Sequence, residues 1–282
     1  MSLATVHSGF GELLRGWRRL RHLSQESLAH EADISQRHLS CLESGRASPS
    51  REMVVHLCHA LDVPLRERNV LLTAAGFAPA YAHRPLDGPE LEAVSRAVDL
   101  MLDGLSPCPA LAVDRDWNLV RANAAALATF SAFVDLDAAL ARSDPEGGAN
   151  VLRLLFHPEG LRPVVADWDV TGPVLLDRVR REVAADPSWA RGRSLLSELI
   201  ELAGFDPGVR PLGAAPDPVL TMALERDDVR VDLFSMIATF GTAQDVTVQE
   251  LRIETFFPAD EASRETLAAL VGGGAAPARE TG

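Results

Sequence analysis

Two adjacent polar residues, Gln36 and Arg37, stand at the start of a short helix predicted over residues 36–44. In the major groove a Gln amide makes a pair of hydrogen bonds with adenine, and an Arg guanidinium makes such a pair with guanine. Ser35, directly before them, can cap the helix and donate to a phosphate at the same time. The pattern therefore predicts that Gln36 and Arg37 contact base edges; contact with phosphate alone is the alternative.

Two short helices joined by a tight turn would position these side chains. Ser24 caps the first helix and Ser35 caps the second. In the second helix Leu39 and Leu42 repeat at i, i+3, so one narrow face packs inward and the polar residues stay outside. Gly45 then ends that helix. The pattern is that of a helix-turn-helix, whose second helix enters the major groove.

This spaced pattern resembles the XRE/Cro-like DNA-binding domain over about the first eighty residues. The matching positions are Arg18, Leu23-Ser24-Gln25, Leu28-Ala29, Ile34-Ser35, Leu39-Ser40, Leu42-Glu43, Gly45-Arg46 and Pro49-Ser50. The resemblance places Gln36 and Arg37 where base contacts are made, with His38 and Cys41 nearby.

The resemblance also implies an ion pair between Arg18 and Glu43 that locks the first helix to the third. The turn departs from the family pattern, because Ala32-Asp33 stands where a Gly is usual. Asp tolerates the left-handed backbone better than most residues, so we expect the turn to form.

Two further side chains are expected to contact phosphate. Gln25 lies at a helix N-terminus, where its amide and the free backbone N–H groups can hold a phosphate, and Arg46 follows the recognition helix. The predicted DNA-binding residues are therefore Gln25, Ser35, Gln36, Arg37, His38, Cys41 and Arg46.

The charge is distributed unevenly along the chain, whose net charge is −13. Residues 1–80 contain nine Arg and eight acidic residues, whereas residues 81–282 contain eighteen Arg and thirty-two acidic residues. The first part is thus close to neutral and the second carries −14. We expect the affinity for DNA to depend on a few placed contacts, doubled by dimerisation.

No sequence pattern points to catalysis, and we expect no catalytic residue. A Gly-rich phosphate loop and a nucleophile elbow are both absent from the sequence. His56, Cys58 and His59 could suggest a metal site, but their segment reads more simply as an amphipathic helix, so no metal or cofactor is expected. Three unclustered cysteines and the lack of a membrane-length apolar run predict a cytoplasmic protein with no membrane contact.

Apolar spacing predicts an α+β protein in two parts. An N-terminal bundle of five helices is predicted over residues 10–21, 24–32, 36–44, 50–61 and 64–75. The expected organisation is a helix-turn-helix domain over 1–83, a linker over 84–89, a ligand-binding and dimerisation domain over 90–271, and a disordered tail over 272–282.

The second part alternates between helix and strand signals. A strand–turn–strand pattern over 109–123 is followed by helical pieces over 150–203 and by three strands within 217–257. In the last strand segment, Val248, Glu250, Arg252 and Glu254 share one face, and Leu251, Ile253 and Phe257 share the other. This order is that of a PAS-like domain with a five-stranded antiparallel sheet.

Four segments also resemble the ligand-binding domain of MmyB-like transcription regulators: 109–123, 150–163, Asp167-Trp168 and 233–260. The resemblance implies a sensor domain with an interior cavity, which in some relatives holds a fatty acid or a similar apolar molecule. The side chains expected to line it are Phe156, Trp168, Leu176, Val179, Phe234, Met236, Leu251 and Ile253. For any one of them, ordinary core packing is the alternative.

Together these features predict a ligand-responsive, sequence-specific DNA-binding regulator that acts as a homodimer on double-stranded DNA. An XRE-like protein-interaction module, or an antitoxin whose second domain binds a partner protein, is the alternative.

Overall fold

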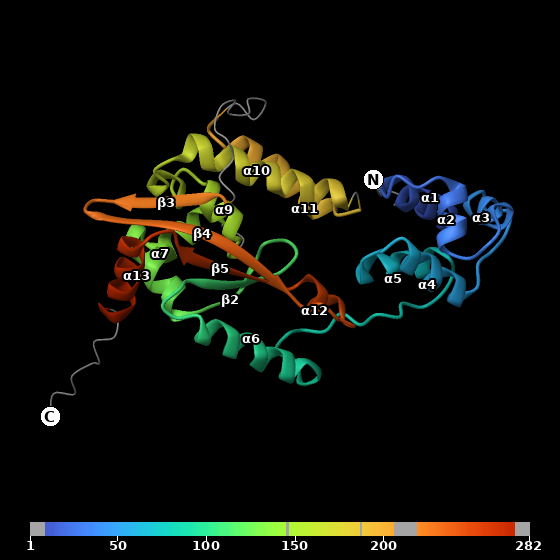
Figure 1. Cartoon of the computed structure of the whole chain (residues 1–282), viewed down its shortest axis with the longest axis horizontal. Coiled ribbons are helices and arrows are strands. Elements are labelled where there is room, and N and C mark those ends of the chain that lie inside the picture. The colour runs from blue at the N-terminus through green and yellow to red at the C-terminus, as the bar shows by residue number, and fades with distance from the viewer. Residues whose placement is uncertain (1–8, 145–146, 187, 206–218, 274–282) are drawn as a thin grey trace, which may run out of the picture. The chain divides into compact units, whose positions relative to one another are not determined.

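The computed structural model describes residues 9–144, 147–186, 188–205 and 219–273 (Figure 1). The chain divides into two compact units. The N-terminal unit comprises residues 1–85 and 241–249, and the sheet unit comprises residues 86–240 and 250–282. The division at 85/86 falls inside the segment predicted as a linker.

Five helices build the N-terminal unit: α1 (Phe10–Leu20), α2 (Gln25–Glu31), α3 (Gln36–Glu43), α4 (Arg51–Ala60) and α5 (Leu65–Ala74). The five predicted helices are confirmed, with bounds that differ by one or two residues. Ser24, Ser35 and Ser50 cap α2, α3 and α4, because each side chain accepts a hydrogen bond from the backbone N–H three residues further on. Leucines from all of these helices fill one common core.

Helix α1 approaches α3 closely at Gly11. A Cβ at this position would lie 2.6 Å from the backbone oxygens of Leu42 and Glu43, whereas a Cβ on Gly16 would meet no atom within 4 Å. We expect Gly11→Ala to lower the free energy of unfolding of this unit by about 1–3 kcal/mol through overpacking. Gly16→Ala should raise it by up to about 1 kcal/mol, because Ala is the better helix former.

Hydrogen exchange of the α1 and α3 amides in the full-length chain measures both effects. The Gly16→Ala variant is the matched control, since it makes the same substitution on the same helix without the contact. Equal protection in the two variants would contradict the close approach at Gly11.

The sheet unit is built around five antiparallel strands in the order β2-β1-β5-β4-β3. The strands are β1 (Ala110–Val113), β2 (Leu119–Ala122), β3 (Thr221–Arg226), β4 (Val229–Thr239) and β5 (Arg252–Pro258). The helices are η1 (Pro89–Leu91), α6 (Glu92–Gly104), α7 (Ala124–Phe133), α8 (Leu136–Ser143), α9 (Val151–Phe156), η2 (Arg162–Val164), α10 (Trp168–Ala185), α11 (Ala190–Leu202) and α13 (Glu261–Gly273). The predicted α+β class and five-stranded antiparallel sheet are therefore confirmed.

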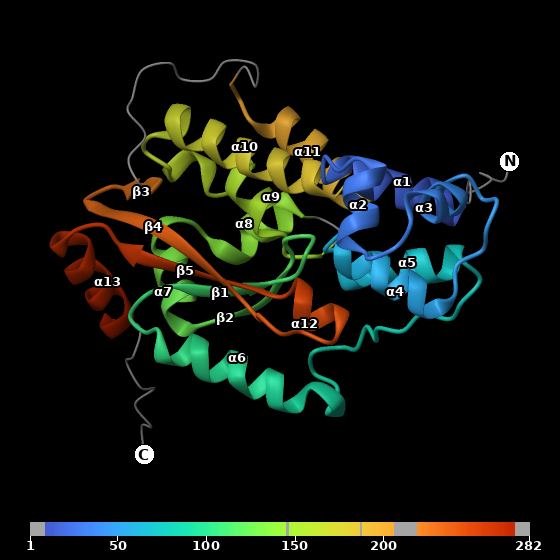
Figure 2. The ribbon, with the colours of Figure 1, turned by 45° about the vertical axis from the view of Figure 1, so that its right-hand side comes forward.

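The sheet separates two cores. Helix α6 covers one face, while α9, α10 and α11 lie on the other (Figure 2). Under α6, Val98 and Leu102 pack with Ala110, Ala112 and Ile253. The larger core lies on the opposite face and includes side chains from α7, α9, α10, α11 and α13. Helix α13 extends two residues into the predicted tail, and residues 274–282 lie outside the described part of the chain.

The connection between β4 and β5 differs from the prediction. The alternation predicts that Val248 and Glu250 belong to the last strand, but residues Val246–Glu250 form the short helix α12, and β5 begins only at Arg252. Asp245 starts the helical turn: its side chain accepts from Thr247 N at 2.9 Å and its carbonyl accepts from Gln249 N at 3.0 Å. This local Asp-to-backbone hydrogen bond outweighs the strand preference of the two valines.

In the part of the chain that the structure describes, no single helix is long and apolar enough to cross a membrane. The bent pair α7 and α8, with an angle of 83° between them, passes a test of length and composition together. In α7, Ala126, Phe130 and Phe133 are buried in the core of the sheet unit, as expected for the core helix of a globular domain.

Candidate DNA-binding helix and ligand cavity

Helix α3 presents a polar N-terminal end to the surface. Leu39 and Leu42 are fully buried, whereas Gln36 and Arg37 are exposed. Ser35 Oγ accepts a hydrogen bond from the backbone N–H of the third helical residue at 3.1 Å, so the first turn is ordered. This arrangement leaves the Gln and Arg side chains available to base edges, as a recognition helix requires.

The turn before α3 adopts the left-handed conformation that the sequence predicts. Asp33 has a φ of +46°, and Gly45, just after the helix, has a φ of +72°.

His38 and Cys41 are half-buried on the flanks of α3. Arg46 is exposed, and its Nε donates to Ser44 Oγ at 2.9 Å, which holds the guanidinium near the helix end. The predicted contacts of these residues with DNA stay predictions.

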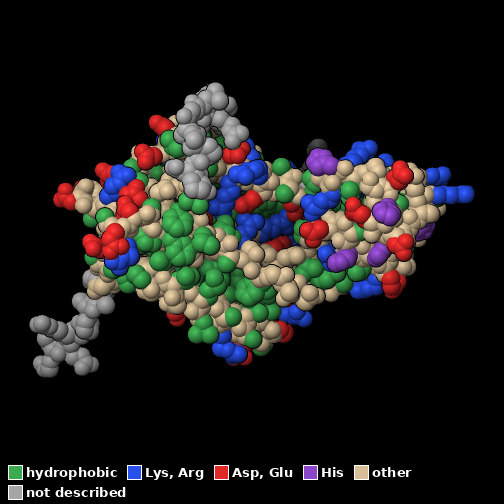
Figure 3. Space-filling model, in the orientation of Figure 1, with side chains coloured by type: hydrophobic (Ala, Val, Ile, Leu, Met, Phe, Trp, Pro, Cys, Tyr) green, Lys and Arg blue, Asp and Glu red, His purple; other side chains and the backbone are tan. Residues whose placement is uncertain are grey.

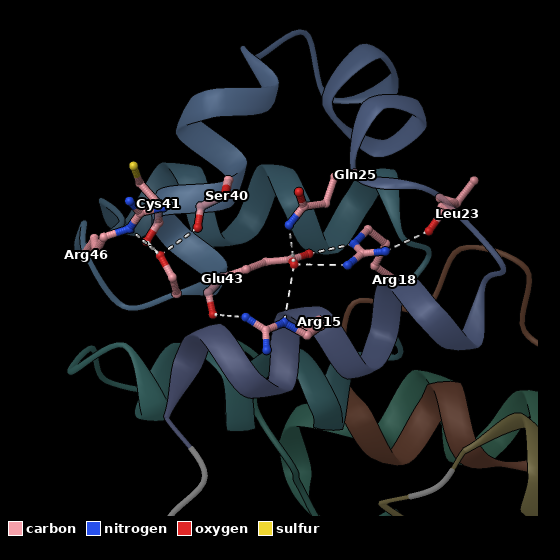
Figure 4. Close-up of polar contacts among 9 residues, drawn as sticks. Arg15, Arg18, Leu23, Gln25, Ser40, Cys41, Glu43 and Arg46 are labelled. Carbon is pink, nitrogen blue, oxygen red and sulfur yellow. Dashed lines mark hydrogen bonds and ion pairs between the residues drawn. The ribbon is translucent and has the colours of Figure 1, made fainter.

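Glu43 is the centre of a buried polar network (Figure 4). Its side chain is fully buried, and Arg18 donates to both carboxylate oxygens, at 2.6 and 3.0 Å. Gln25 donates to the same carboxylate from α2 at 2.8 Å, and Arg15 Nη2 donates to the Glu43 carbonyl at 2.9 Å. The Arg18–Glu43 ion pair is thus confirmed, and a carboxylate on α3 joins α1, α2 and α3.

Gln25, whose predicted contact with phosphate stays a prediction, also has a contact within the protein. Its amide N–H₂ points to Glu43 (Figure 4), so in this structure the side chain has a hydrogen-bonding partner within the protein. Sequence reasoning did not predict this hydrogen bond, because the two residues are 18 positions apart. Only the backbone N–H groups at the start of α2, and the second N–H of the amide, remain as phosphate donors.

The network shifts the titration of Glu43. Burial alone would raise its pKa, but the hydrogen bonds from Arg18, Gln25 and Arg15 and the charge of Arg18 outweigh burial, so the pKa is lowered from 4.5. The pKa of Arg18 is raised, chiefly by the same hydrogen bond. The carboxylate is therefore charged at neutral pH, and its charge is matched inside the bundle.

A cavity of about 360 Å³ opens inside the sheet unit. It lies between the α9–α11 side of the sheet and helices α7, α8, α9 and α10. Its apolar lining consists of Leu111, Trp117, Leu119, Ala122, Ala126, Leu127, Phe130, Leu136, Leu140, Ala149, Val151, Leu152, Leu154, Leu155, Leu161, Val174, Leu175, Val219, Leu220, Met222, Leu233 and Phe256. The polar residues that line it are Asp137, Arg178, Arg181, Ser235 and Glu254. Such a mainly aliphatic lining with a few polar groups suits a small apolar ligand.

One edge of the cavity carries a compact charged cluster around Trp117. The guanidinium of Arg178 lies 4.6 Å from the indole centre, and that of Arg252 lies 5.2 Å from it. Glu182 accepts from Arg178 Nε at 3.3 Å and from Arg252 Nη1 at 2.7 Å. Arg178 Nη1 also donates to Glu254 at 3.2 Å. Two positive and two negative groups thus lie together, and within the described residues Arg178 Nη2 is buried without a hydrogen-bond partner.

The side chains predicted to line the cavity lie elsewhere. The eight residues Phe156, Trp168, Leu176, Val179, Phe234, Met236, Leu251 and Ile253 are all outside its lining, so this prediction is wrong for the cavity. Phe156, Leu176 and Val179 are core residues of the larger core, and Leu251 and Ile253 belong to the core under α6. Trp168 packs edge-on against Phe156 and donates from Nε1 to the Ala203 carbonyl at 2.8 Å.

The error on β4 is one of strand parity. Leu233 and Ser235 face the cavity, so Phe234 and Met236 point to the opposite side of the sheet. There Phe234 stacks on Phe257 with 5.7 Å between ring centres. The physical cause is that both faces of β4 carry apolar residues, so alternation alone does not say which face is inside.

The residues that sequence reasoning missed are Trp117, Arg178, Ser235 and Glu254. One signal was present: charged residues alternate with apolar ones at Arg252 and Glu254 in a strand that is otherwise strongly apolar. Charged side chains occupy inward positions of a strand only where they have partners of opposite charge. Here Arg252 pairs with Glu182, and Glu254 pairs with Arg178.

Among the described residues, no group of three or more His, Cys, Asp and Glu side chains could hold a metal ion. Cys58, in the segment that could suggest a metal, is buried in the N-terminal core. Burial raises the pKa of its thiol to about 12, against a smaller opposing effect of Arg68. This thiol is therefore protonated at neutral pH and serves as a small apolar core residue.

Comparisons with known proteins match both units. Residues 94–270 match the family model for the MmyB-like transcription regulator ligand binding domain, and residues 10–71 match a model for a helix-turn-helix domain. The transcriptional regulator ClgR of Mycobacterium tuberculosis, from strains CDC 1551/Oshkosh and ATCC 25618/H37Rv, is 36% identical over 81 residues. These residues make up 29% of this chain and 70% of ClgR. The first match covers most of the sheet unit together with residues 241–249, and the second includes α3, the helix that carries Gln36 and Arg37.

Proposed function

Because this chain belongs to the MmyB-like transcription regulators and carries a helix-turn-helix domain, we propose that it binds a specific DNA operator and that a small apolar molecule in the cavity changes this binding. A fatty acid is the proposed ligand. The observation that carries the proposal is the aliphatic cavity of about 360 Å³ in the sheet unit of a chain whose other unit exposes Gln36 and Arg37 on a capped helix.

The ligand class follows from the chemistry of the lining. Each methylene group of a ligand that leaves water for such a lining contributes about 0.8 kcal/mol, so an alkyl chain gains affinity without polar contacts. Arg178 and Arg181 are among the few charged residues that line the cavity. An acidic head group could accept a hydrogen bond from Arg178 Nη2, which lacks a partner within the described residues.

Native mass spectrometry of the purified full-length chain tests the ligand proposal. We expect a co-purified molecule of low mass with an alkyl chain, or binding of added dodecanoate with a change in tryptophan fluorescence, because Trp117 lines the cavity. A chain that carries no such molecule and whose fluorescence does not respond to dodecanoate would contradict the proposal.

The DNA half of the proposal predicts different roles for two arginines. Arg37→Ala should weaken binding to the selected operator by about 1–3 kcal/mol and relax the preference at one base pair, because a paired contact with guanine is lost. Arg46→Ala should weaken binding to operator and random DNA alike and reduce the salt dependence. Anisotropy titrations on both kinds of duplex at two salt concentrations distinguish the roles. If Arg37→Ala lowered both affinities equally, Arg37 would not read bases.

We also infer that two copies bind the operator together through the sheet unit. Phe234 and Phe257 stack on one face of the sheet, and Met236 beside them is 59% exposed. Figure 3 shows hydrophobic side chains gathered on the sheet unit in the region that β4 and β5 occupy in Figure 1. A second copy is the proposed occupant, since two recognition helices on successive major grooves need a shared interface. Sedimentation of the full-length chain should show a dimer that Met236→Arg weakens; an unchanged dimer would place the interface elsewhere.

A further inference from the structure

The connection between β4 and β5 leaves the sheet unit and belongs to the N-terminal unit. Residues 241–249 pack with residues 1–85, although the chain before and after them forms adjacent strands of the sheet. Both of these strands line the cavity: β4 through Leu233 and Ser235, and β5 through Glu254 and Phe256. A single segment is therefore joined at each end to a wall of the cavity and is packed in the unit that carries the recognition helix.

Specific polar contacts hold this segment against the end of the helical bundle. Asp245, whose side chain is 6% exposed, forms an ion pair with Arg84, in which Arg84 Nη1 lies 3.0 Å from Asp245 Oδ2. Val246 N donates to the Ala82 carbonyl at 2.8 Å, and Thr247 Oγ1 donates to the Arg84 carbonyl. Val246 and Val248 are buried. Hydrogen bonds, an ion pair and buried valines therefore hold the segment in place, whereas mobile surface loops make few such contacts.

Gln249 makes the contact that matters most for the bundle, because its side chain caps the start of helix α5. Helix α5 begins after Pro64, whose side chain cannot accept a hydrogen bond, so the helix has no cap of its own. Gln249 Oε1 instead accepts from Leu65 N at 2.7 Å, across 184 positions of sequence. Leu65, Leu71 and Leu72 of α5 are buried, so a change at the start of α5 acts on the packing of the bundle.

We propose that residues 241–249, through Gln249 and Asp245, are the element that transmits cavity occupancy to the DNA-binding helices. The inference rests on the proposed ligand response of the cavity. A ligand that alters the spacing of β4 and β5 moves both ends of the segment, and the segment shifts only by straining the bonds to Leu65 and Arg84. A ligand changes DNA affinity only if it binds more tightly to one of two arrangements of the protein that differ in their affinity for DNA. In this proposal the two arrangements differ in the position of residues 241–249.

The test compares operator binding with and without dodecanoate in the full-length chain. The operator is a duplex selected from random DNA by the wild-type protein, and dodecanoate binding is read from tryptophan fluorescence. We expect wild type to change its operator affinity by a factor of about 5 to 150. In Gln249→Ala combined with Asp245→Ala, the ratio of operator affinities with and without dodecanoate should fall toward one, while the affinity for dodecanoate stays within about twofold of wild type.

Two matched variants serve as controls. Gln244→Ala removes the same side chain from an exposed position of the same segment and should keep the wild-type factor. Gln249→Glu keeps an acceptor oxygen at the start of α5, where a negative charge is favourable. It should therefore show the same change in operator affinity on addition of dodecanoate as wild type. Loss of the factor in Gln244→Ala as well would overturn the specific role of Gln249.

The outcomes separate this inference from the proposed function. If wild type couples dodecanoate to operator and the double variant couples them equally, the inference is overturned and the proposed function stands. If dodecanoate fails to bind, or binds without any effect on wild type, both are overturned. Hydrogen exchange of wild type supplies a second measurement that needs no variant: dodecanoate should change the protection of the Leu65 amide, and unchanged protection would count against the inference.

Discussion

Arg18→Met is expected to destabilise the N-terminal unit by about 3 kcal/mol, the largest stability effect that the structure predicts. The substitution keeps the aliphatic stem but removes both hydrogen bonds to Glu43, whose side chain is fully buried. A buried carboxylate without its main partner is costly, and the remaining donors, Gln25 and Arg15, compensate only in part. Hydrogen exchange of the α3 amides in the full-length chain measures the loss.

Arg19→Met is the matched control. Arg19 is the next residue on α1 and is exposed, so the same change of side chain should alter protection by less than about 0.5 kcal/mol. Equal protection of α3 in wild type and Arg18→Met would show that the ion pair contributes no net stability.

The same network predicts a pH dependence with a definite sign. The pKa of Glu43 is lower in the folded chain than its ordinary value of 4.5. The stability that this shift contributes is fully present above pH 4.5 and is lost as the pH falls through the lower, folded pKa. Glu43→Gln removes the titrating group, so the protection of α3 in this variant should fall less steeply below pH 4.5 than in wild type. Parallel curves for the two proteins would contradict the shift.

The largest effect on ligand binding is expected from Ser235→Phe, which should weaken dodecanoate binding by about two-hundredfold. Ser235 lies on β4 and lines the cavity of about 360 Å³. A phenyl ring there would displace roughly four methylene groups of the ligand, each of which contributes about 0.8 kcal/mol. Fluorescence titration with dodecanoate measures the affinity directly.

Met236→Phe is the control for this prediction, because Met236 is the next residue on the same strand and faces the opposite side of the sheet, with 59% exposure. It should bind dodecanoate with wild-type affinity. Weak binding by Met236→Phe and normal binding by Ser235→Phe would mean that the ligand occupies the other face of the sheet.

The helix-turn-helix could be predicted well because its signals are local. The caps Ser24 and Ser35, the leucine spacing of α3 and the glycine after it all act within one or two helical turns. The left-handed Asp33 could be expected for the same reason. The hydrogen bond from Gln25 to Glu43 could not, since it depends on how two helices pack.

The sheet unit shows the opposite case. Its five strands could be predicted from their composition, but the cavity lining could not, because both faces of the sheet are apolar. The side chains of Phe234 and Leu233 are equally plausible core residues in sequence, and only the packing of helices on each face decides between them. The Val-x-Val pattern of α12 predicts a strand but suits a helix equally well. The hydrogen bond from Thr247 N to Asp245 and the burial of both valines decide for the helix.

The measurement that tests the central claim most directly is an operator titration of the full-length chain with and without dodecanoate, repeated with Ser235→Phe, at a dodecanoate concentration that saturates wild type but not the variant. We expect dodecanoate to change the operator affinity of wild type by a factor of about 5 to 150 and to leave that of Ser235→Phe unchanged. Identical operator affinities of wild type in the two conditions, with the cavity shown to be occupied by tryptophan fluorescence, would contradict a ligand-responsive regulator.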